Sequence, residues 1–564
     1  MRRTRHLLGL LAVVASLALV AAACGGNDDD EASSSSTTAP AAEEVPQGGT
    51  LTLGWEQEPD CTDWINSCGG SSYGYWAMGV TTMPRSFDIT WDGENADYKA
   101  SSLLTGEPKL ETEPKQVVTY EINPKAVWSD GQPITSKDWK YTWTQIAGPD
   151  AADIYDATGY DKIESVDDSD PAKAVVTFKE PYAGWKALFG GGYGVMPSHL
   201  LEGKDRHAEM KDGYTWSGGP WKIEKWEKGV GITLIPNDNY WGTKPKLDKI
   251  EFKFVTDTAS EFKALTGGEV DAIYPQPQLD VVAQMKSGLT GIKSKVTTGA
   301  SLEAFWVNNS KAPFDTIPFR QAFAYALDRD AIVKRLFGDI GVDKASQSLE
   351  PQLVAAYTDI DAFSMYKRDL KKVDDIMTKA GWAKGSDGIW AKDGQKATFT
   401  VKTTAGNARR ELTQQVAQTQ LKEAGFDMVI ANEKAGDLFG KSAPNGDYQV
   451  ALYAQVLTSL EPGACTLFCA KNNPDKNNGT GQNWQRVDVP RADADLMSLD
   501  TELDPAKRGE AGKRAMKALA EDMVSLPLDP LPTILLWHDK VVGPVGDNPV
   551  LGPLANVNEW GIKK

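Results

Sequence analysis

The sequence has few of the residues from which catalytic and metal sites are usually built. Its 564 residues include four histidines and five cysteines, and His199, His207 and His538 are scattered along the chain. A histidine-based site would therefore need distant residues to converge. The sequence also lacks HExxH, a Walker loop and a GxGxxG string followed by a suitable acid. We therefore expect no enzyme activity, no cofactor and no metal site.

Two strings resemble catalytic motifs but lack the context that those motifs need. Residues Gly70–Gly74 fit GxSxG, yet a cysteine-containing, glycine-rich loop precedes them and no helix pattern follows closely. Residues Ser364–Lys367 fit SxxK, but the companion strings SDN and KTG are missing. We interpret both as chance matches. A secreted hydrolase stays as an alternative that requires a serine, an acid and one scattered histidine to meet.

Positive charge is scarce as well. The chain has 60 Lys and Arg side chains against 78 Asp and Glu, and its formal net charge is −18. Nucleic acids and anionic lipids attract basic surfaces, so this balance argues against either as the main partner. The charged fraction of 24% and the hydrophobic fraction of 41% are typical of a soluble globular protein. The length predicts about two to four domains.

A long apolar run occurs at the N-terminus. Arg2, Arg3 and Arg5 precede the uncharged stretch from Leu7 to Ala23, which is too short and too rich in small residues for a good membrane span. This order is typical of a secretory signal peptide, predicted here over 1–23. The run ends in Ala-Ala-Ala-Cys-Gly-Gly, which resembles a bacterial lipobox with Cys24 as the lipidated residue, although Ala21 stands where that motif usually has Leu. Plain secretion is the alternative.

The segment that follows is predicted to be a lipidated, disordered tether over 24–47. It reads GGNDDDEASSSSTTAPAAEEVPQ after Cys24 and cannot bury enough apolar surface to become ordered. It would hold the folded part near the outer face of the cell membrane, or in the periplasm.

The remaining cysteines favour disulfides over free thiols. Without Cys24 the chain has four, Cys61, Cys68, Cys465 and Cys469, and an even number in an exported protein is typical of disulfide pairs. The local pairings Cys61–Cys68 and Cys465–Cys469 are the simplest, but four cysteines allow three connectivities.

Hydrophobic periodicity predicts a mixed α/β chain. Alternating apolar residues predict strands at 50–55, 118–122, 174–178, 231–235 and 250–254. Helical patterns follow at 318–327, from Asp328 or Asp330 to Gly338, at 370–380 and at 412–424. Strands at 397–401 and 428–430 on either side of the last helix predict a βαβ unit.

Four segments resemble one protein family. Residues 128–139 (WSDGQPITSKDW) are similar to the W-x-D-G-x-P-x-T-A-x-D signature of the extracellular solute-binding proteins of ABC importers, family 5. Similar strings are GGPWKI at 218–223 with NDNYWG at 237–242 and KLDKI at 246–250, GEVD at 268–271, and PFD at 313–315 with FRQA at 319–322 and ALDR at 326–329. This family binds oligopeptides, dipeptides or nickel. The quoted motifs identify the fold and not the ligand, since Asp130-Gly131 suits a turn and Thr135 or Ser136 a helix N-cap.

The resemblance implies an α/β, periplasmic-binding-protein-like type II fold of the large kind (cluster C), with two hinged lobes and an inserted domain. Lobe I would comprise 48–305, with the insertion at about 70–215, and 531–564; lobe II would comprise 306–530. The chain would cross near 305–309 and return near 531–537, where the closely spaced Pro527, Pro530 and Pro532 suit a stiff crossover. The protein would be a monomer that delivers its cargo to ABC permease subunits.

The resemblance also implies a ligand class. Peptide-binding members carry a W-x-A-D-Y-type stretch whose Asp pairs with the ligand's α-amine, and the matching stretch here is 452–462, which lacks that Asp. Glu461 is the nearest acid and is predicted to neutralise the ammonium of a bound peptide. Peptides remain the expected class, with oligosaccharide, opine or metal-chelate ligands as alternatives. The further ligand-binding candidates are Trp64, Tyr274, Asn308, Tyr453, Asn483 and Trp484. A lipid-anchored adhesion or signalling protein is the other rival, and it would lack ligand-driven closure.

Overall fold

The computed structural model describes residues 44–564 apart from 93, 94, 150, 191, 192, 300, 355, 356, 358, 457, 458, 477, 478 and 480. Residues Val45–Lys564 form one compact unit. The predicted signal peptide, Cys24 and most of the 24–47 tether lie outside the described residues. Within the described ranges, no helix has both the length and the apolar character that crossing a membrane requires.

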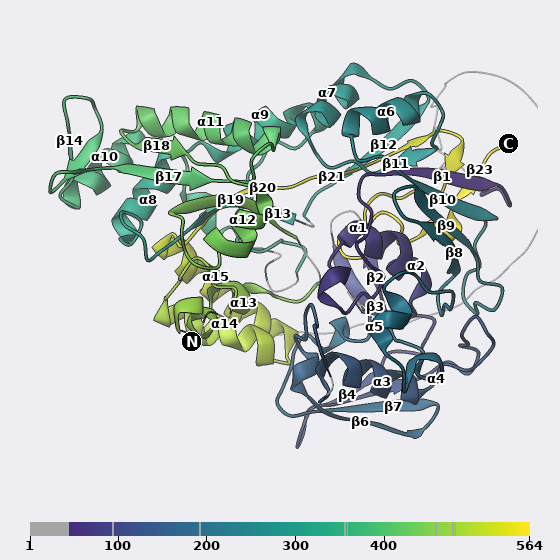
Figure 1. Cartoon of the computed structure of the whole chain (residues 1–564). Coiled ribbons are helices and arrows are strands. Elements are labelled where there is room, and N and C mark those ends of the chain that lie inside the picture. The colour runs from purple at the N-terminus through teal and green to yellow at the C-terminus, as the bar shows by residue number, and fades with distance from the viewer. Residues whose placement is uncertain are drawn as a thin grey trace, which may run out of the picture. The chain divides into compact units, whose positions relative to one another are not determined.

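A seven-stranded sheet joins both ends of the unit that begins at Val45 (Figure 1). Its strands, in spatial order, are β12 (Ile292–Thr297), β21 (Thr533–His538), β11 (Ala272–Ile273), β1 (Thr50–Trp55), β10 (Lys249–Phe254), β9 (Gly231–Pro236) and β8 (Trp221–Glu227). β1 runs parallel to β10 and β11, and β21 runs antiparallel to β11 and β12. A strand from the C-terminal part thus completes a sheet begun at the N-terminus.

A five-stranded sheet forms the centre of the second lobe. Its strands, in spatial order, are β18 (Asp427–Ile430), β17 (Thr398–Lys402), β19 (Val450–Val456), β13 (Ser301–Val307) and β20 (Leu526–Pro530). β17 is parallel to β18 and β19, whereas β13 is antiparallel to β19 and β20. Strand β13 is buried along its whole length, as expected for a central strand.

Smaller sheets complete the strand inventory. One has four strands in the spatial order β4 (Lys109–Glu111), β5 (Val117–Glu121), β7 (Lys173–Phe178) and β6 (Ile163–Asp170). A three-stranded sheet consists of β14 (Ala383–Lys384), β15 (Trp390–Lys392) and β16 (Gln395–Lys396). Two further sheets have two strands each, β2 (Phe87–Trp91) with β3 (Ala96–Ala100), and β22 (Val541–Val542) with β23 (Gly561–Ile562). The four-stranded and β2–β3 sheets lie within the segment predicted as an insertion, between β1 and β8 in sequence.

The two longest of the described helices lie in the second lobe. Those before β13 are α1 (Ser72–Gly74), α2 (Val80–Thr82), α3 (Ser136–Ala147), α4 (Ser198–Leu201), α5 (Arg206–Met210), α6 (Thr258–Thr266) and α7 (Leu279–Ser287). Those after it are α8 (Ile317–Ala326), α9 (Arg329–Phe337), α10 (Leu370–Lys379), α11 (Ala408–Glu423), α12 (Ala435–Asp437), α13 (Ala464–Phe468), α14 (Pro490–Thr501) and α15 (Pro505–Asp522).

Each large sheet has its own hydrophobic core. One core runs from Leu302 to Leu528 with Val282 added, and two others contain mainly residues before 283 and after 533. We call 301–530 lobe II and the rest of 45–564 lobe I. The chain passes from β12 to β13 between Thr297 and Ser301 and returns from β20 to β21 between Pro530 and Thr533, as Figure 1 shows. The first passage lies before the expected 305–309, because β13 already pairs with β19 from Ser301 onward.

The strands and helices predicted from periodicity are present with small shifts in their ends. Asp328 is the N-cap of α9 and accepts a hydrogen bond from the Ala331 N–H at 2.9 Å. The predicted βαβ unit is formed by β17, α11 and β18, with β17 and β18 parallel. In the WSDG segment, Gly131 has φ +87° and its N–H donates to the Trp128 carbonyl at 2.8 Å, which is the predicted turn. Thr135 is the N-cap of α3.

Candidate functional site

The carboxyl ends of strands from both large sheets lie at the two passages between the lobes. In lobe II, β17, β18, β19 and β20 all run in one direction, so their carboxyl ends share one sheet edge. In lobe I, one edge of the sheet likewise holds the carboxyl ends of four strands that run in one direction, namely β1, β10, β11 and β12. Strands β12 and β20 leave these edges to form the passages. Ligand sites of open α/β sheets form outside the carboxyl ends of strands, so these two edges make up the candidate site.

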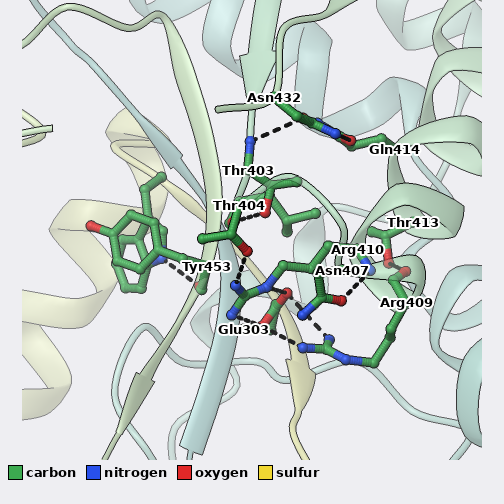
Figure 2. Close-up of polar contacts among 12 residues, drawn as sticks. Glu303, Thr403, Thr404, Asn407, Arg409, Arg410, Thr413, Gln414, Asn432 and Tyr453 are labelled. Carbon is green, nitrogen blue, oxygen red and sulfur yellow. Dashed lines mark hydrogen bonds and ion pairs between the residues drawn. The ribbon is translucent and has the colours of Figure 1, made fainter. Parts of the chain in front are cut away.

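Glu303 is the buried carboxylate of the lobe II edge (Figure 2). It lies in β13, opposite Ala454 of β19 and Asp529 of β20. Arg410 Nε lies 2.8 Å from Oε1, and Arg409 Nη2 lies 3.2 Å from Oε2. Burial alone would raise the pKa of Glu303, but the two guanidinium groups outweigh it and lower that pKa. Burial and the Glu303 charge raise the pKa of Asp529 to about 7.

The start of α11 positions both arginines. Asn407 is the N-cap, and its side-chain oxygen accepts a hydrogen bond from the Arg410 N–H at 3.0 Å. Thr404 Oγ1 accepts another from Arg410 Nη1 at 3.0 Å. One turn further, Gln414 Nε2 donates to Asn432 Oδ1 at 2.8 Å, which ties the helix to the loop after β18 (Figure 2). The guanidinium groups are therefore held in place before any ligand arrives.

Aromatic rings gather at the carboxyl ends of β1 and β11 in lobe I. Trp55 ends β1, Tyr274 follows β11, and their rings are stacked with centroids 6.1 Å apart. Tyr73 packs 5.2 Å from Trp55 and donates a hydrogen bond to the Tyr274 carbonyl at 3.1 Å. Trp76 meets the Tyr274 ring edge-on at 5.7 Å. These rings form a continuous aromatic wall.

Asp547 is a buried carboxyl group beside that wall. Its residue is 3% exposed, and the hydroxyl groups of Tyr274 and Thr533 adjoin the carboxyl. Burial raises the pKa of Asp547 to about 7, and the two hydroxyls oppose this rise only in part. No basic side chain of the described residues is among the groups that lower this pKa. Asp547 therefore has no cation of its own.

Of two predicted ligand contacts, Tyr274 directly follows β11 in lobe I, and Tyr453 lies in the middle of β19 in lobe II. The Tyr453 ring stacks on Trp306 at 5.4 Å, and its hydroxyl accepts a hydrogen bond from Gln485 Nε2 at 3.3 Å. Trp64, a further candidate, is buried in the lobe I core. A direct role of these residues in ligand binding stays a proposal.

Three other candidates lie within the framework of lobe II. Asn308 is fully buried, and its Nδ2 donates to the Gly446 carbonyl at 3.0 Å. Asn483 is equally buried and donates to the Val487 carbonyl at 2.8 Å. Trp484 is partly buried against the lobe II core. The structure gives each of them contacts within lobe II and does not bring them to Tyr274.

Glu461, the predicted partner of a ligand ammonium, lies where lobe II contacts lobe I. Its Oε2 is 3.3 Å from Arg508 Nη1. The preceding residue, Leu460, donates its N–H to Tyr98 Oη of lobe I at 3.1 Å. Burial raises the pKa of Glu461 to about 7, while the Arg508 charge opposes the rise. The chain itself thus already supplies a cation to this carboxylate.

Sequence reasoning missed Glu303, Arg409, Arg410 and Asp547. For Glu303 a signal was present, because an acid inside the otherwise apolar stretch 301–307 has to be paired when the strand is buried. Adjacent arginines at the start of a predicted helix were the natural partners. For Asp547 the sequence offers no such signal, since its burial depends on strands that are far away along the chain.

The described cysteines form two disulfides, Cys61–Cys68 in lobe I and Cys465–Cys469 in lobe II. This is the local pairing among the three connectivities. Lipidation of Cys24 lies outside the described residues.

The GxSxG string does not form a nucleophile elbow. Ser72 begins α1 and is preceded by a short 3-10 turn over Ser67–Gly69, where an elbow requires a strand. Helical structure does continue to Thr82, which corrects the expectation that no helix follows. The histidines of the described chain contact other groups, namely Asp130 for His199, Asp63 for His207 and the Leu265 carbonyl for His538.

Known proteins resemble this chain along most of its length. The family model described as bacterial extracellular solute-binding proteins, family 5 Middle, matches residues 103–476. The oligopeptide-binding protein OppA of Mycobacterium tuberculosis (strain H37Rv) is 28% identical over 501 residues, 86% of this chain and 80% of that protein.

Solved structures share the fold. The periplasmic EDTA-binding protein EppA has a TM-score of 0.81 at 23% identity, covering 93% of this chain and 98% of its own. The oligopeptide-binding protein AppA of Bacillus subtilis, in complex with a nonapeptide, has a TM-score of 0.74 at 22% identity, covering 92% and 100%. The fold is the α/β, two-lobed type II fold of periplasmic binding proteins. Since the family model covers more than half of the sequence, the chain belongs to the bacterial extracellular solute-binding proteins, family 5.

Proposed function

We propose that this protein is the extracytoplasmic substrate-binding component of an ABC importer. It captures a peptide between its lobes and delivers it to a membrane permease. The observation that carries the proposal is the placement of strand carboxyl ends from both sheets, with charged and aromatic side chains, at the two passages. Relatives named as oligopeptide-binding proteins support the ligand class.

Lobe closure supplies the mechanism. The lobes contact each other through the Ala183 N–H, which donates to the Asp500 carbonyl at 2.7 Å, and through Leu460 and Tyr98. A ligand that contacts both edges binds the closed arrangement more tightly than an open one and therefore shifts the population toward it. The closed form would then dock on the permease. This transport cycle makes and breaks no covalent bond in the ligand.

The proposed protein acts as a monomer attached to the outer face of the membrane through lipid on Cys24. Cys24→Ala should leave the precursor uncleaved or release the protein from the membrane fraction. Normal cleavage with unchanged membrane partition would contradict the lipid anchor.

Identification of the cargo tests the central proposal. Protein purified from its native membrane fraction is denatured, and the released small molecules are identified by mass spectrometry. Small-angle scattering of the stripped protein, with and without the identified molecule, then measures closure. We expect peptides and a smaller radius of gyration on binding. A released chelate or oligosaccharide would replace the peptide assignment, and hydrolysis of the bound peptide would indicate an enzyme.

A further inference from the structure

A loop of lobe II reaches into lobe I. The Leu460 side chain is 7% exposed and packs in the hydrophobic core of lobe I, although Tyr453 before it and Ala464 after it belong to the core of lobe II. The Leu460 N–H donates to Tyr98 Oη of β3 at 3.1 Å. We propose that residues 459–461, here called the latch loop, hold the two lobes together without a ligand and release them as the pH rises.

The lobe I surface that meets lobe II beside the latch loop is fixed by contacts within lobe I. Gln116 Oε1 accepts a hydrogen bond from the Tyr182 N–H at 2.6 Å, and Gln116 Nε2 donates to the Tyr182 carbonyl at 3.0 Å. Next along the chain, the Ala183 N–H donates to the Asp500 carbonyl of lobe II at 2.7 Å. The ordered chain at 182–183 therefore offers lobe II a preformed contact.

The Glu461 carboxyl lies inside this contact. A Cβ on Gly184 of lobe I would be only 3.2 Å from Glu461 Cγ, so the two chains approach each other closely. Arg508 Nη1 lies 3.3 Å from Glu461 Oε2, yet no group of the described chain donates a hydrogen bond to that oxygen. The charged and phenolic side chains of lobe I that interact electrostatically with the carboxyl are Lys186, Asp97, Tyr98 and Tyr182. Separating the lobes would therefore replace these neighbours by water.

Titration of Glu461 makes the latch loop depend on pH. Burial raises the pKa of Glu461 to about 7, and the Arg508 and Lys186 charges oppose this rise only in part. In water the carboxyl would have a pKa near its ordinary value of 4.5, so the closed state holds a proton that the open state releases. The contribution to closure is complete below about pH 4.5 and is lost as the pH rises to about 7.

Asp500 adds an effect of the same sign at lower pH. Burial raises the pKa of its carboxyl to about 6, while the charges of Lys471 in lobe II and Lys162 in lobe I oppose the rise. Two phenol groups, Tyr182 of lobe I and Tyr357 of lobe II, also interact with the Asp500 charge. Both acids at the contact therefore favour the closed state when they are protonated.

The inference rests on the proposed movement of the lobes and adds a control that does not involve cargo. A latch that forms without cargo leaves less of the closing free energy to be supplied by the ligand. Because the closed form is favoured at acid pH, capture is stronger there and release is easier at neutral pH. The assignment gives Glu461 a role between the lobes in place of the predicted contact with a ligand ammonium.

Hydrogen exchange of the ligand-stripped protein measures the latch directly. The Ala183 and Leu460 amides are followed by mass spectrometry from pH 5.5 to pH 8, and the exchange rates are corrected for the intrinsic effect of pH. In wild type we expect both corrected rates to rise by up to about tenfold per pH unit below pH 7, and in Glu461→Gln to stay low. At a single pH, Tyr98→Phe should speed exchange at Ala183 about 2- to 12-fold, and Leu460→Ala about tenfold. The surface control Asp375→Asn should match wild type.

The outcomes separate the latch from the capture of cargo. The same pH response in Glu461→Gln as in wild type, or unchanged Ala183 exchange in both Tyr98→Phe and Leu460→Ala, overturns the latch and leaves ligand capture between the lobes standing. The expected exchange, together with a radius of gyration that the identified cargo does not reduce, overturns ligand-driven closure and leaves the latch standing. One polar and one apolar variant keep the test independent of a folding defect in either.

Discussion

Each lobe buries a carboxyl group at the edge of its sheet, yet the two groups have opposite surroundings. Glu303 of lobe II lies against Arg409 and Arg410, which lower its pKa. Asp547 of lobe I has two neighbouring hydroxyls, no basic group among the described residues lowers its pKa, and burial raises that pKa to about 7. The difference teaches that the lobe II edge pairs Glu303 with two arginines yet leaves both oxygens of Asp529 without a hydrogen-bond partner, whereas the lobe I edge surrounds Asp547 with hydroxyl groups.

The largest expected effect comes from breaking the lobe II pair. Glu303→Gln removes the acid that pairs with the Arg409 guanidinium, whose side chain is 3% exposed, and leaves only the Asp529 carboxyl beside it. Removing one partner of a buried ion pair costs about 3–5 kcal/mol of the free energy of unfolding. Urea unfolding should show this loss, whereas Asp547→Asn should retain at least the wild-type stability, because it removes an acid that has no cation.

Asp375→Asn is the matched control for that comparison. Asp375 pairs with Lys371 on the surface of α10, where both side chains are more than half exposed. No measurable change in stability is expected there. A loss in Asp547→Asn as large as that in Glu303→Gln would show that both carboxylates are structural, and the contrast between the edges would fail.

The two disulfides, one in each lobe, allow a comparison of how much each cross-link stabilises its lobe by restricting the unfolded chain. Their cysteines are seven residues apart in lobe I and four residues apart in lobe II. In the loop-closure model, cross-links this short each contribute about 2–2.5 kcal/mol, with the longer loop slightly favoured. Cys61→Ser/Cys68→Ser and Cys465→Ser/Cys469→Ser should lose stability by similar amounts in urea unfolding. An unaffected double variant would indicate that the corresponding pair is reduced in the mature protein, which an intact mass measurement can check.

The pH dependence of stability tests a second lobe I carboxyl that lacks a cation. Burial and the Glu56 charge raise the pKa of Glu261 to about 9, so the folded protein keeps a proton that the unfolded chain releases above its ordinary pKa of 4.5. The folded state binds more protons between these values, and the free energy of unfolding therefore falls as pH rises from about 4.5 to about 9.

Glu261→Gln should remove this dependence. The difference in unfolding free energy between variant and wild type should grow by up to ~1.4 kcal/mol per pH unit across that window, in favour of the variant. Thermal or urea unfolding from pH 5 to pH 8 measures it. Parallel curves for the two proteins would mean that Glu261 is ionised in the folded state.

Apart from the Asp375→Asn control, the smallest effect is expected at Tyr453 in lobe II. Tyr453→Phe removes the hydrogen bond from Gln485 Nε2 and leaves the stack on Trp306 intact. A neutral hydrogen bond contributes about 0.5–1.5 kcal/mol. Urea unfolding should show a change in this range, and an unchanged affinity for the identified cargo would exclude the Tyr453 hydroxyl as a ligand contact.

Local structure was determined to a large extent by the sequence itself. Alternation over Thr50–Trp55 reproduces β1 residue for residue, and the Asp328 cap places the start of α9. These features depend on hydrophobic periodicity, helix capping and turn residues within a few positions of one another, so they can be identified in the sequence without knowledge of the tertiary structure. The family motifs are of the same kind, since Gly131 and Thr135 serve a turn and a cap. They identify the fold and leave the ligand open.

Only the tertiary structure decided which acids are neutralised and which are not. Glu461 could be nominated from its position in the chain, but its pairing with Arg508 arises from packing of separate elements. Asp547 is surrounded by hydroxyl groups because strands β11, β12 and β21 bring Tyr274, Thr297 and Thr533 beside it. The cost of an unpaired buried charge depends on every group that surrounds it, and those groups come from segments that meet only after the sheets have formed.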